Sequence, residues 1–322
     1  MSVLVYTESE NGKFKRSALE VVSYAKAVAD QMGGSATAIS FNASENESLG
    51  TYGASKVLNV SDDKLSTFNA EACATAISQA AEKEGASVIV VSSSANSKFL
   101  APILAAKLKA GYVPNVVEAP ESTSPFTVKR TAFSNKGFAH TEITTDIKII
   151  GVSNNAFGLK ENKIDASVEA FSPELGEGEF SVKSVEVDKV AGKVTIADAE
   201  IVVSGGRGLK GPENWGMIEE LAEVLGAATA CSKPVSDMGW RPHGEHVGQT
   251  GKPVASNLYI AIGISGAIQH LAGVSSSKTK VVINTDPEAP FFKAADYGIV
   301  GDAFEVVPKL VEKLKEFKAQ NA

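Results

Sequence analysis

The stretch "LYIAIGISGAIQHLAG" (258–273) joins a short apolar run to a glycine turn and then to a helical pattern. A strand, a tight turn and a helix in this order are typical of a βαβ unit, which favours an α/β fold with a parallel sheet. The turn contains Gly263, Ser265 and Gly266. Three roles fit it: Ser265 as a nucleophile, backbone amides that bind a phosphate, or glycines that pack a tight corner.

The first half of the chain repeats this alternation of short β-rich runs and longer helical patterns. Strands are expected at 2–8, 35–41, 56–60 and 87–93, and helices at about 17–32, 70–84 and 99–110. The order predicts a mainly parallel sheet. Further runs follow one another with no convincing helix between them, and we expect an antiparallel addition to the same domain from 126–133, 140–152 and 180–187.

The patterns weaken around "DKVAGKVTIADAE", and the strand "EIVVSGG" begins a second α/β unit. We therefore predict two domains, residues 1–190 and 199–322, each a mainly parallel sheet flanked by helices. In the second domain, strands are expected at 227–232, 258–264 and 280–285, and helices at 213–225, after 264 and at 303–318. The span from 233 to 254 reads as irregular, polar and rich in glycine.

Composition excludes several functions. The formal charge of -7 argues against a nucleic-acid partner. Cys73 and Cys231 lie far apart, which fits a reducing compartment and gives no metal motif. The N-terminus lacks the pattern of a signal or transit peptide, and no window is long and apolar enough to span a bilayer. These features predict a cytoplasmic protein without direct membrane insertion.

The sequence "GRGLKG" (206–211) matches the pattern GxGxxG between a strand and a helix. A nicotinamide-binding fingerprint would place an acidic residue after the next strand, whereas this chain has Ser232 and Lys233 there. Arg207 and Lys233 would instead form a cationic site for an anionic ligand. An equally good alternative is that Pro212 starts a helix and Arg207 is a solvated surface charge.

The hydrolase interpretation of Ser265 is weaker than the phosphate interpretation. A hydrolase elbow reads GxSxG, and Ala267 stands at its last position. His270 follows on the same short helix, so it projects along that helix and does not face Ser265. In the phosphate interpretation Ser265 caps the helix, while Gly266 lets a ligand approach the backbone. His270 could equally be a buried histidine with satisfied hydrogen bonds.

Other polar residues follow the remaining strands of the second domain. Strand carboxyl ends bind ligands in open α/β sheets, so Ser232, Ser265, Asn284 and Asp302 are expected to converge on one crevice. Asp302 with Glu305 also predicts a capping box for the last helix. The polar span between the strands suits the lining of a site and carries Trp240, Arg241, His243, His246, Gln249 and Thr250. The two histidines lack a third ligand, so no metal site is predicted.

Taken together, "SGGRGLKGPENW", "VGQTGK", "LYIAIGISGAIQHLAG" and "INTDPEAPFFKAADYGIVGD" resemble the alpha subunits of electron transfer flavoproteins. The resemblance is strong over about 199–318 and diffuse over the first domain. It implies a heterodimer in which the second, Rossmann-like domain holds FAD and the first domain pairs with a beta subunit that carries AMP. Such a protein is an electron carrier without substrate turnover of its own. It would pass electrons from dehydrogenases, such as the acyl-CoA dehydrogenases of fatty acid β-oxidation, to a quinone oxidoreductase.

The resemblance also implies a set of FAD-binding residues. Thr250 would bond near the reactive ring nitrogen, with His270 and Lys233 supplying charge near the pyrimidine edge. Lys233 stands where the family usually has arginine, so it keeps the charge but loses the planar fork, and we expect an altered flavin potential. Two alternatives remain, a nonredox nucleotide-binding module and a serine hydrolase. The implied FAD contacts are Arg207, Ser232, Lys233, Val247, Gly248, Gln249, Thr250, Ser265, Gly266, Ala267, Ile268, Gln269, His270, Asn284, Asp302 and Ala303.

Overall fold

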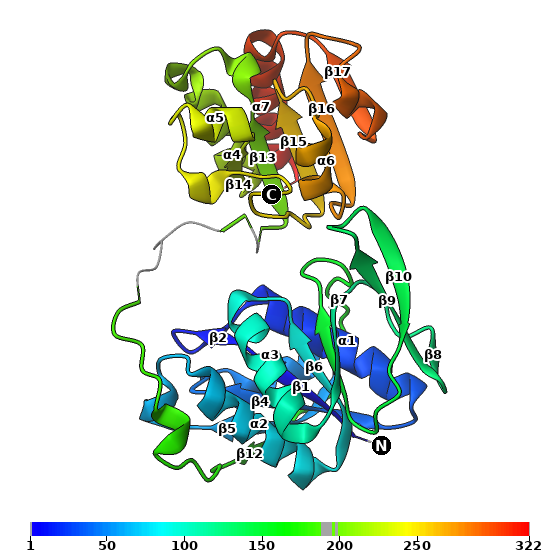
Figure 1. Cartoon of the computed structure of the whole chain (residues 1–322). Helices are drawn as coiled ribbons and strands as arrows, with labels where there is room; N and C mark the ends of the chain where they lie inside the picture. The colour runs from blue at the N-terminus through cyan, green and yellow to red at the C-terminus, as the bar shows by residue number, and fades with distance from the viewer. Residues whose placement is uncertain (1, 188–194, 197–198, 322) are drawn as a thin grey trace. The chain divides into compact units, whose positions relative to one another are not determined.

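The computed structural model describes residues 2–187, 195–196 and 199–321 of the chain (Figure 1). They form two compact units, one of Met1–Ala132 with Phe138–Lys189 and one of Phe133–Gly137 with Val190–Ala322. The weak patterns predicted at 188–198 lie largely outside the described residues. Each unit contains a large sheet flanked by helices, so the predicted α/β class is confirmed.

The sheet of the first unit has a parallel centre. Its strands run in the order β10-β9-β7-β11-β6-β1-β4-β5-β12. Their bounds are β1 Ser2–Thr7, β4 Ser35–Phe41, β5 Ala54–Val60, β6 Ala86–Ser92, β7 Gly111–Val116, β9 Phe126–Ala132, β10 Gly137–Glu142, β11 Lys148–Val152 and β12 Ser167–Ala170. Strand β1 is parallel to β4 and β6, and β11 is parallel to β6 and β7.

The predicted antiparallel addition is only partly right. Strand β9 is antiparallel to β7 and to the short β8 (Ser122–Thr123), but β11 lies in the parallel centre of the sheet. No strand forms at 180–187 among the described residues, although the sequence alternates there. The edge beside β5 is taken instead by β12, which was not predicted. An alternating sequence becomes a strand only where a neighbour offers hydrogen bonds, so the exposed Val182, Val185 and Val187 remain irregular.

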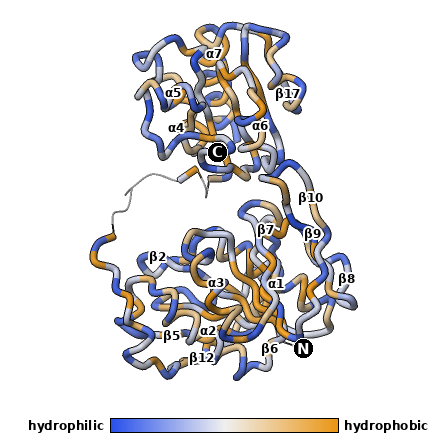
Figure 2. Tube along the Cα trace, in the orientation of Figure 1, coloured by the Kyte–Doolittle hydropathy of each residue, from blue (hydrophilic) through white to orange (hydrophobic). Residues whose placement is uncertain are grey.

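Three helices cover the two faces of this sheet. Helix α1 (Arg16–Gln31) packs on one face, and α2 (Ala70–Glu84) and α3 (Ala95–Leu108) pack on the other. Apolar residues gather along the strands between these layers (Figure 2). Helix α3 begins earlier than the predicted residue 99 because the Ser94 side chain accepts a hydrogen bond from the Ser97 N–H at 3.1 Å.

A buried carboxylate ties helix α1 to the loop after β11. Glu20 is 4% exposed, and its two oxygens accept hydrogen bonds from the backbone N–H groups of Asn155, Phe157 and Gly158 at 2.7, 2.9 and 2.8 Å. Charge-assisted bonds of this length are among the stronger ones in proteins. The carboxylate therefore fixes a loop that has no regular structure of its own.

The second unit contains a five-stranded parallel sheet in the order β14-β13-β15-β16-β17. The chain passes from β13 through α4 to β14 on one side, and then adds β15, β16 and β17 on the other side of β13. After β14 the chain crosses back over β13 to place β15 on its other side, so the connections leave β13 in opposite directions. The carboxyl ends of β13 and β15 are therefore the switch point, where open sheets bind ligands. The bounds are β13 Ile201–Gly205, β14 Ala228–Cys231, β15 Leu258–Ile262, β16 Thr279–Asn284 and β17 Tyr297–Val300.

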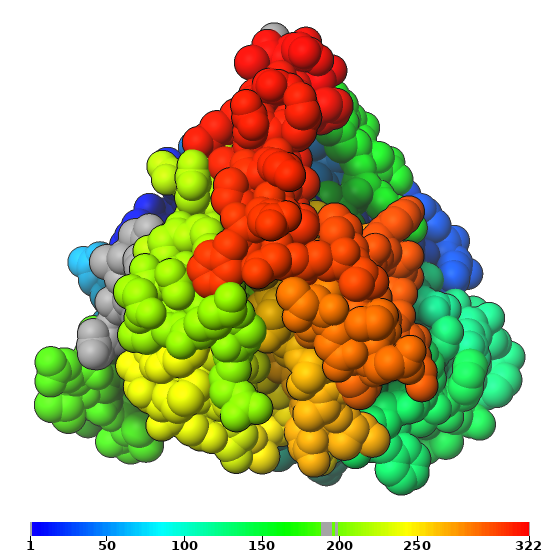
Figure 3. Space-filling view, turned by 90° about the horizontal axis from the view of Figure 1, so that it is seen from above, coloured from blue at the N-terminus to red at the C-terminus, as the bar shows by residue number. Residues whose placement is uncertain are grey.

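Helices α4 (Gly216–Leu225) and α7 (Ala303–Gln320) lie together over one face of this sheet. Figure 3 shows α7, in red, on the outer surface of the unit. The other face is covered by the short helix α6 (Ile268–Val274) and by the segments around Val247, Val254 and Phe291. The span predicted as irregular contains the one-turn helix α5 (Lys233–Asp237) and the 3-10 turn η6 (His243–Glu245). None of the helices in the described part of the chain is both long and apolar enough to cross a membrane.

Candidate functional site

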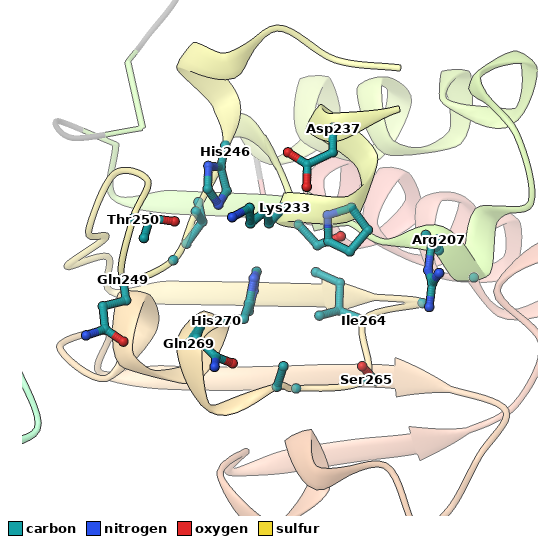
Figure 4. Close-up of a pocket in the computed structure, with 18 of the residues that line it drawn as sticks. Arg207, Lys233, Asp237, His246, Gln249, Thr250, Ile264, Ser265, Gln269 and His270 are labelled. Carbon is teal, nitrogen blue, oxygen red and sulfur yellow. The ribbon is translucent and has the colours of Figure 1, made fainter. Parts of the chain in front are cut away.

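A cavity of about 530 Å³ lies at the carboxyl ends of the strands of the second sheet (Figure 4). Its walls come from the turns after β13, β14 and β15, from the segment that follows η6, and from the end of β16. The volume falls within the range of small-molecule sites, roughly 300–1,000 Å³. The lining residues are Arg207, Gly208, Ser232, Lys233, Pro234, Asp237, His246, Val247, Gly248, Gln249, Thr250, Gly263, Ile264, Ser265, Gly266, Ala267, Gln269, His270 and Asn284.

Two glycine turns meet backbone to backbone at the switch point. The N–H of Gly206 donates to the Ile262 carbonyl at 2.9 Å, and the N–H of Gly208 donates to the Gly263 carbonyl at 3.0 Å. A Cβ atom on Gly206 would lie 2.1 Å from the Gly263 oxygen, and one on Gly208 would lie 2.7 Å from the Gly263 Cα. Gly263 itself has φ +64°. The glycines therefore do pack a tight corner, and Gly208 and Gly263 of that corner line the cavity.

Two cations border the cavity at its solvent edge. Arg207 begins the 3-10 turn η4 (Arg207–Leu209) after β13, and Lys233 begins α5 after β14. In Figure 4, Arg207 and Ser265 lie toward one end of the cavity, whereas Gln249 and Thr250 lie toward the other, with Lys233 between them. The only acidic lining residue in the described part of the chain is Asp237, at the end of α5. The charge of the lining therefore favours an anionic ligand.

Ser265 does not cap helix α6 as predicted. The helix begins at Ile268 and its N-cap residue is Ala267, whose position follows a turn at Gly266 with φ +88°. Ser265 is exposed and lies before this turn, so its hydroxyl borders the cavity. Its carbonyl accepts a hydrogen bond from the Phe291 N–H at 3.0 Å, which anchors the turn to the segment that carries Phe291.

The segment Val247–Thr250 is held by backbone hydrogen bonds on both of its sides. The N–H of Val247 donates to the Cys231 carbonyl at 3.0 Å, and the N–H of Gln249 donates to the Gln269 carbonyl at 2.8 Å. The segment therefore joins the end of β14 to helix α6. Gln249 and Thr250 remain exposed at the cavity.

His270 is buried in α6, with 6% of its surface exposed. Its Nε2 lies 3.0 Å from the Tyr259 hydroxyl, and the Tyr259 ring stacks on Phe291. Burial, assisted by electrostatic repulsion from His246 and opposed by the Val247 backbone, lowers the pKa of His270 to about 4. The imidazole is uncharged at neutral pH, which corrects the expectation that His270 supplies charge. With Nε2 engaged by Tyr259, the histidine also lacks the arrangement of a base for Ser265.

Three of the sequence-predicted residues do not line the cavity. Ile268 is 67% exposed at the start of α6. Asp302 accepts a hydrogen bond from the Phe304 N–H at 3.0 Å and so caps α7, while Ala303 is buried against the helix core. Asn284 does line it, and its side-chain amide donates to the Ile264 carbonyl at 3.1 Å, bracing the glycine turn. The other predicted contacts lie together in the cavity wall.

The lining also includes residues that the sequence did not single out as ligand contacts. His246 belonged to the polar span expected to line a site, and Gly208 and Gly263 belonged to the recognised turns. No sequence pattern indicated that Asp237 lines the cavity, because its position depends on where the one-turn helix α5 ends. These additional residues are Gly208, Pro234, Asp237, His246, Gly263 and Ile264.

Comparison with known proteins assigns the chain. The model of the electron transfer flavoprotein domain matches residues 3–189, and that of the electron transfer flavoprotein FAD-binding domain matches residues 195–275. The chain therefore belongs to the electron transfer flavoprotein family. It is similar over nearly its whole length to proteins described as the alpha subunit, so within the family it is an alpha subunit that binds FAD.

Three relatives illustrate this similarity, all described as electron transfer flavoprotein subunit alpha. The protein of Bacillus subtilis is 37% identical, with 98% of this chain and 97% of the relative aligned. That of Thermoanaerobacterium thermosaccharolyticum is 36% identical, with 98% of each chain aligned. That of Syntrophomonas wolfei is 34% identical, with 97% of this chain and 98% of the relative aligned. The hydrolase and nonredox alternatives have no support from these matches.

The cavity fits a flavin nucleotide by three observations. Gly208 and Gly263 line the cavity without side chains, so a ligand there meets bare backbone, and their close approach to each other leaves no room for a Cβ atom. Arg207 and Lys233 supply positive charge for a diphosphate. The two histidines of the wall, His246 and His270, each carry a buried Nδ1 atom without a hydrogen-bond partner among the described residues, so the protein alone leaves polar groups of this site unsatisfied.

Proposed function

We propose that the cavity at the switch point of the second sheet is the FAD site, and that the protein uses it to carry electrons between partner proteins. The observation that carries this proposal is that nearly all of the cavity wall falls within residues 195–275, the range matched by the FAD-binding domain. When bound, FAD supplies electron transfer in steps of one or two electrons. The residues of this chain supply binding, orientation and electrostatics.

Different residues of the cavity wall are suited to bind different groups of FAD. Arg207 is suited to bind an anionic group because its guanidinium stands beside the glycine corner, where a ligand can approach the backbone. Lys233 provides the second positive charge and would favour electron-rich forms of the cofactor. Gln249 and Thr250 offer neutral hydrogen-bonding groups on a segment held at both sides.

The partners follow from the family. We infer a heterodimer in which the domain at residues 1–190 pairs with a beta subunit that carries AMP, while the domain at 199–322 binds FAD. Electrons would arrive from primary dehydrogenases, including acyl-CoA dehydrogenases of fatty acid β-oxidation, and leave to a quinone oxidoreductase. Such redox encounters are typically small and transient. The cytoplasm is the compartment we propose, since Cys73 and Cys231 are both buried free thiols.

The test is an absorption spectrum of the chain purified with its beta subunit, followed through stepwise anaerobic reduction. We expect flavin bands that bleach reversibly, with one FAD per heterodimer. The variant Arg207→Gln should bind FAD more weakly, whereas Lys313→Gln, on the exposed side of α7, should bind it normally. A complex that stays colourless after incubation with FAD would refute the proposed site.

A further inference from the structure

The imidazole of His246 lies beneath the loop 247–251. Only 2% of this residue is exposed. A Cβ atom on Gly251 would lie 2.9 Å from its Cγ and Nδ1, and one on Gly248 would lie 3.4 Å from its Nε2. Backbone thus approaches the ring from both edges, so the loop takes its shape around His246.

The main chain on either side of the ring is fixed independently. The N–H of His246 donates to the His243 carbonyl at 3.1 Å, and the N–H of Lys252 donates to the His246 carbonyl at 2.9 Å. The loop 247–251 begins after His246 and ends at Lys252, whose N–H bonds back to the His246 carbonyl. It contains no helix or strand. Helix α6 holds the loop from outside, through the bond from the Gln249 N–H to the Gln269 carbonyl at 2.8 Å, and the His246 ring fills its inner side between Gly248 and Gly251.

The surroundings of the ring disfavour a charge. Burial lowers the pKa of His246 from its usual 6.5, and the neighbouring charges of His243 and Lys233 lower it further, while Asp237 opposes them. From helix α6 the facing group is His270, which is itself uncharged at neutral pH. The adjacent Glu245 is engaged by Arg241 at 2.7 Å. His246 therefore remains a neutral ring whose Nδ1 has no partner among the described residues.

We propose that His246 is a positioning residue for FAD: its neutral ring holds the loop 247–251 so that Gln249 and Thr250 face the cavity, and its protonation opens the loop and weakens FAD binding. The inference rests on the proposed FAD site. His246 need not touch the cofactor, because it acts through the loop that does.

The direction of the pH effect follows from proton linkage. With the loop open, the ring meets water and titrates near 6.5, whereas with the loop closed its pKa is lower. Between the closed-loop and the open-loop pKa of His246, closing the loop therefore releases a proton. The free energy of loop closure is fully present above the open-loop pKa and is lost as the pH falls toward the closed-loop pKa. The FAD dissociation constant should rise by up to about tenfold per pH unit below roughly pH 6.5. His270 titrates at about 4, so its protonation belongs to a lower pH range.

The experiment measures the FAD dissociation constant of the full chain with its beta subunit by flavin fluorescence, from about pH 5 to 8. The wild type and the control His243→Gln, which alters an exposed neighbour on η6, should both show the rise at acid pH. His246→Gln supplies a neutral side chain of similar reach, so it should bind FAD within a few-fold of the wild type and lose the acid rise. His246→Ala should bind roughly tenfold more weakly at every pH, because the loop loses its support.

Each outcome bears on the proposal. An acid rise that persists in both His246 variants, or that is absent from the wild type, would overturn it. An NMR titration of the protein without FAD provides an independent readout, and a His246 ring that titrates at or above 6.5 would also overturn it. A wild type that binds no FAD at pH 8 would refute the underlying FAD site, whereas normal FAD binding with unchanged His246 variants refutes this inference alone.

Discussion

Replacement of Gly206 by alanine is the sharpest test of how the cavity is built. The residue has an extended backbone that any amino acid can adopt, so alanine would introduce no torsional strain there. Its Cβ would, however, lie 2.1 Å from the Gly263 oxygen and 2.7 Å from the Gly263 carbonyl carbon. Since the obstacle is backbone, it cannot rotate away. The two turns must move apart by roughly 1 Å to relieve the contact.

The cost can be worked from the contacts that this movement breaks. Two backbone hydrogen bonds join the turns, from Gly206 to Ile262 and from Gly208 to Gly263, and each contributes about 1 kcal/mol. Overpacking adds about 1–3 kcal/mol. We therefore expect the second unit to lose roughly 3–5 kcal/mol of unfolding free energy, and FAD to bind at least tenfold more weakly because Gly208 and Gly263 in the cavity wall are displaced.

Both quantities can be measured on one preparation. The chain has two tryptophans, Trp215 and Trp240, and both lie in the second unit, so their fluorescence during urea unfolding of the FAD-free protein reports on that unit. Gly216→Ala is the matched control, because a Cβ there meets no atom within 4 Å. It should leave stability within about 1 kcal/mol and FAD affinity unchanged. If Gly206→Ala unfolds and binds FAD as Gly216→Ala does, the close approach of the turns does not form the site.

Three further substitutions test the remaining features. Glu20→Ala should destabilise the first unit by about 3–5 kcal/mol, since three backbone N–H groups lose a buried carboxylate, and hydrogen exchange of the loop after β11 will show this directly. Arg207→Gln should weaken FAD binding by roughly ten- to hundredfold in a fluorescence titration, and an unchanged affinity would make the arginine a mere surface charge. Lys233→Arg keeps the charge but changes its geometry, so the FAD stoichiometry should hold while the midpoint potential shifts in a spectroelectrochemical titration. An identical potential would mean that charge alone matters at this position.

The sequence allowed most elements to be predicted where local signals were strong. Helix α2 runs over the predicted residues because Asn69 accepts a hydrogen bond from the Ala72 N–H at one end and Gly85 turns to φ +59° at the other. Strand β11 was placed wrongly because alternation reveals a strand but not its partner. Its neighbours, β6 and β7, are chosen by long-range packing that no local pattern records.

The site could be predicted in outline for a related reason. Residues that immediately follow a parallel strand meet at one edge of the sheet whatever the rest of the chain does, so Ser232, Ser265 and Asn284 were expected together, and all three line the cavity. The protonation of His270 could not be foreseen, because it depends on burial beside Tyr259. The role of Asp302 was ambiguous, since one carboxylate can cap a helix or face a ligand, and here it caps α7.

The distribution of charge in the cavity suggests how such a site can bind an anion and still tune its electron affinity. Burial keeps both His246 and His270 neutral near pH 7, so positive charge comes from Arg207 and Lys233 at the solvent edge, opposed by Asp237. A cation at a wet edge acts through a high effective dielectric and can be altered without collapsing the core. The glycine corner beside these cations is instead made of backbone, where a Cβ atom would collide with the opposite turn. Glycine backbone therefore sets the shape of the site, whereas exposed side chains set its charge. Exchange of one cation for another, as in Lys233→Arg, keeps that charge, so we expect it to shift the potential while FAD stays bound.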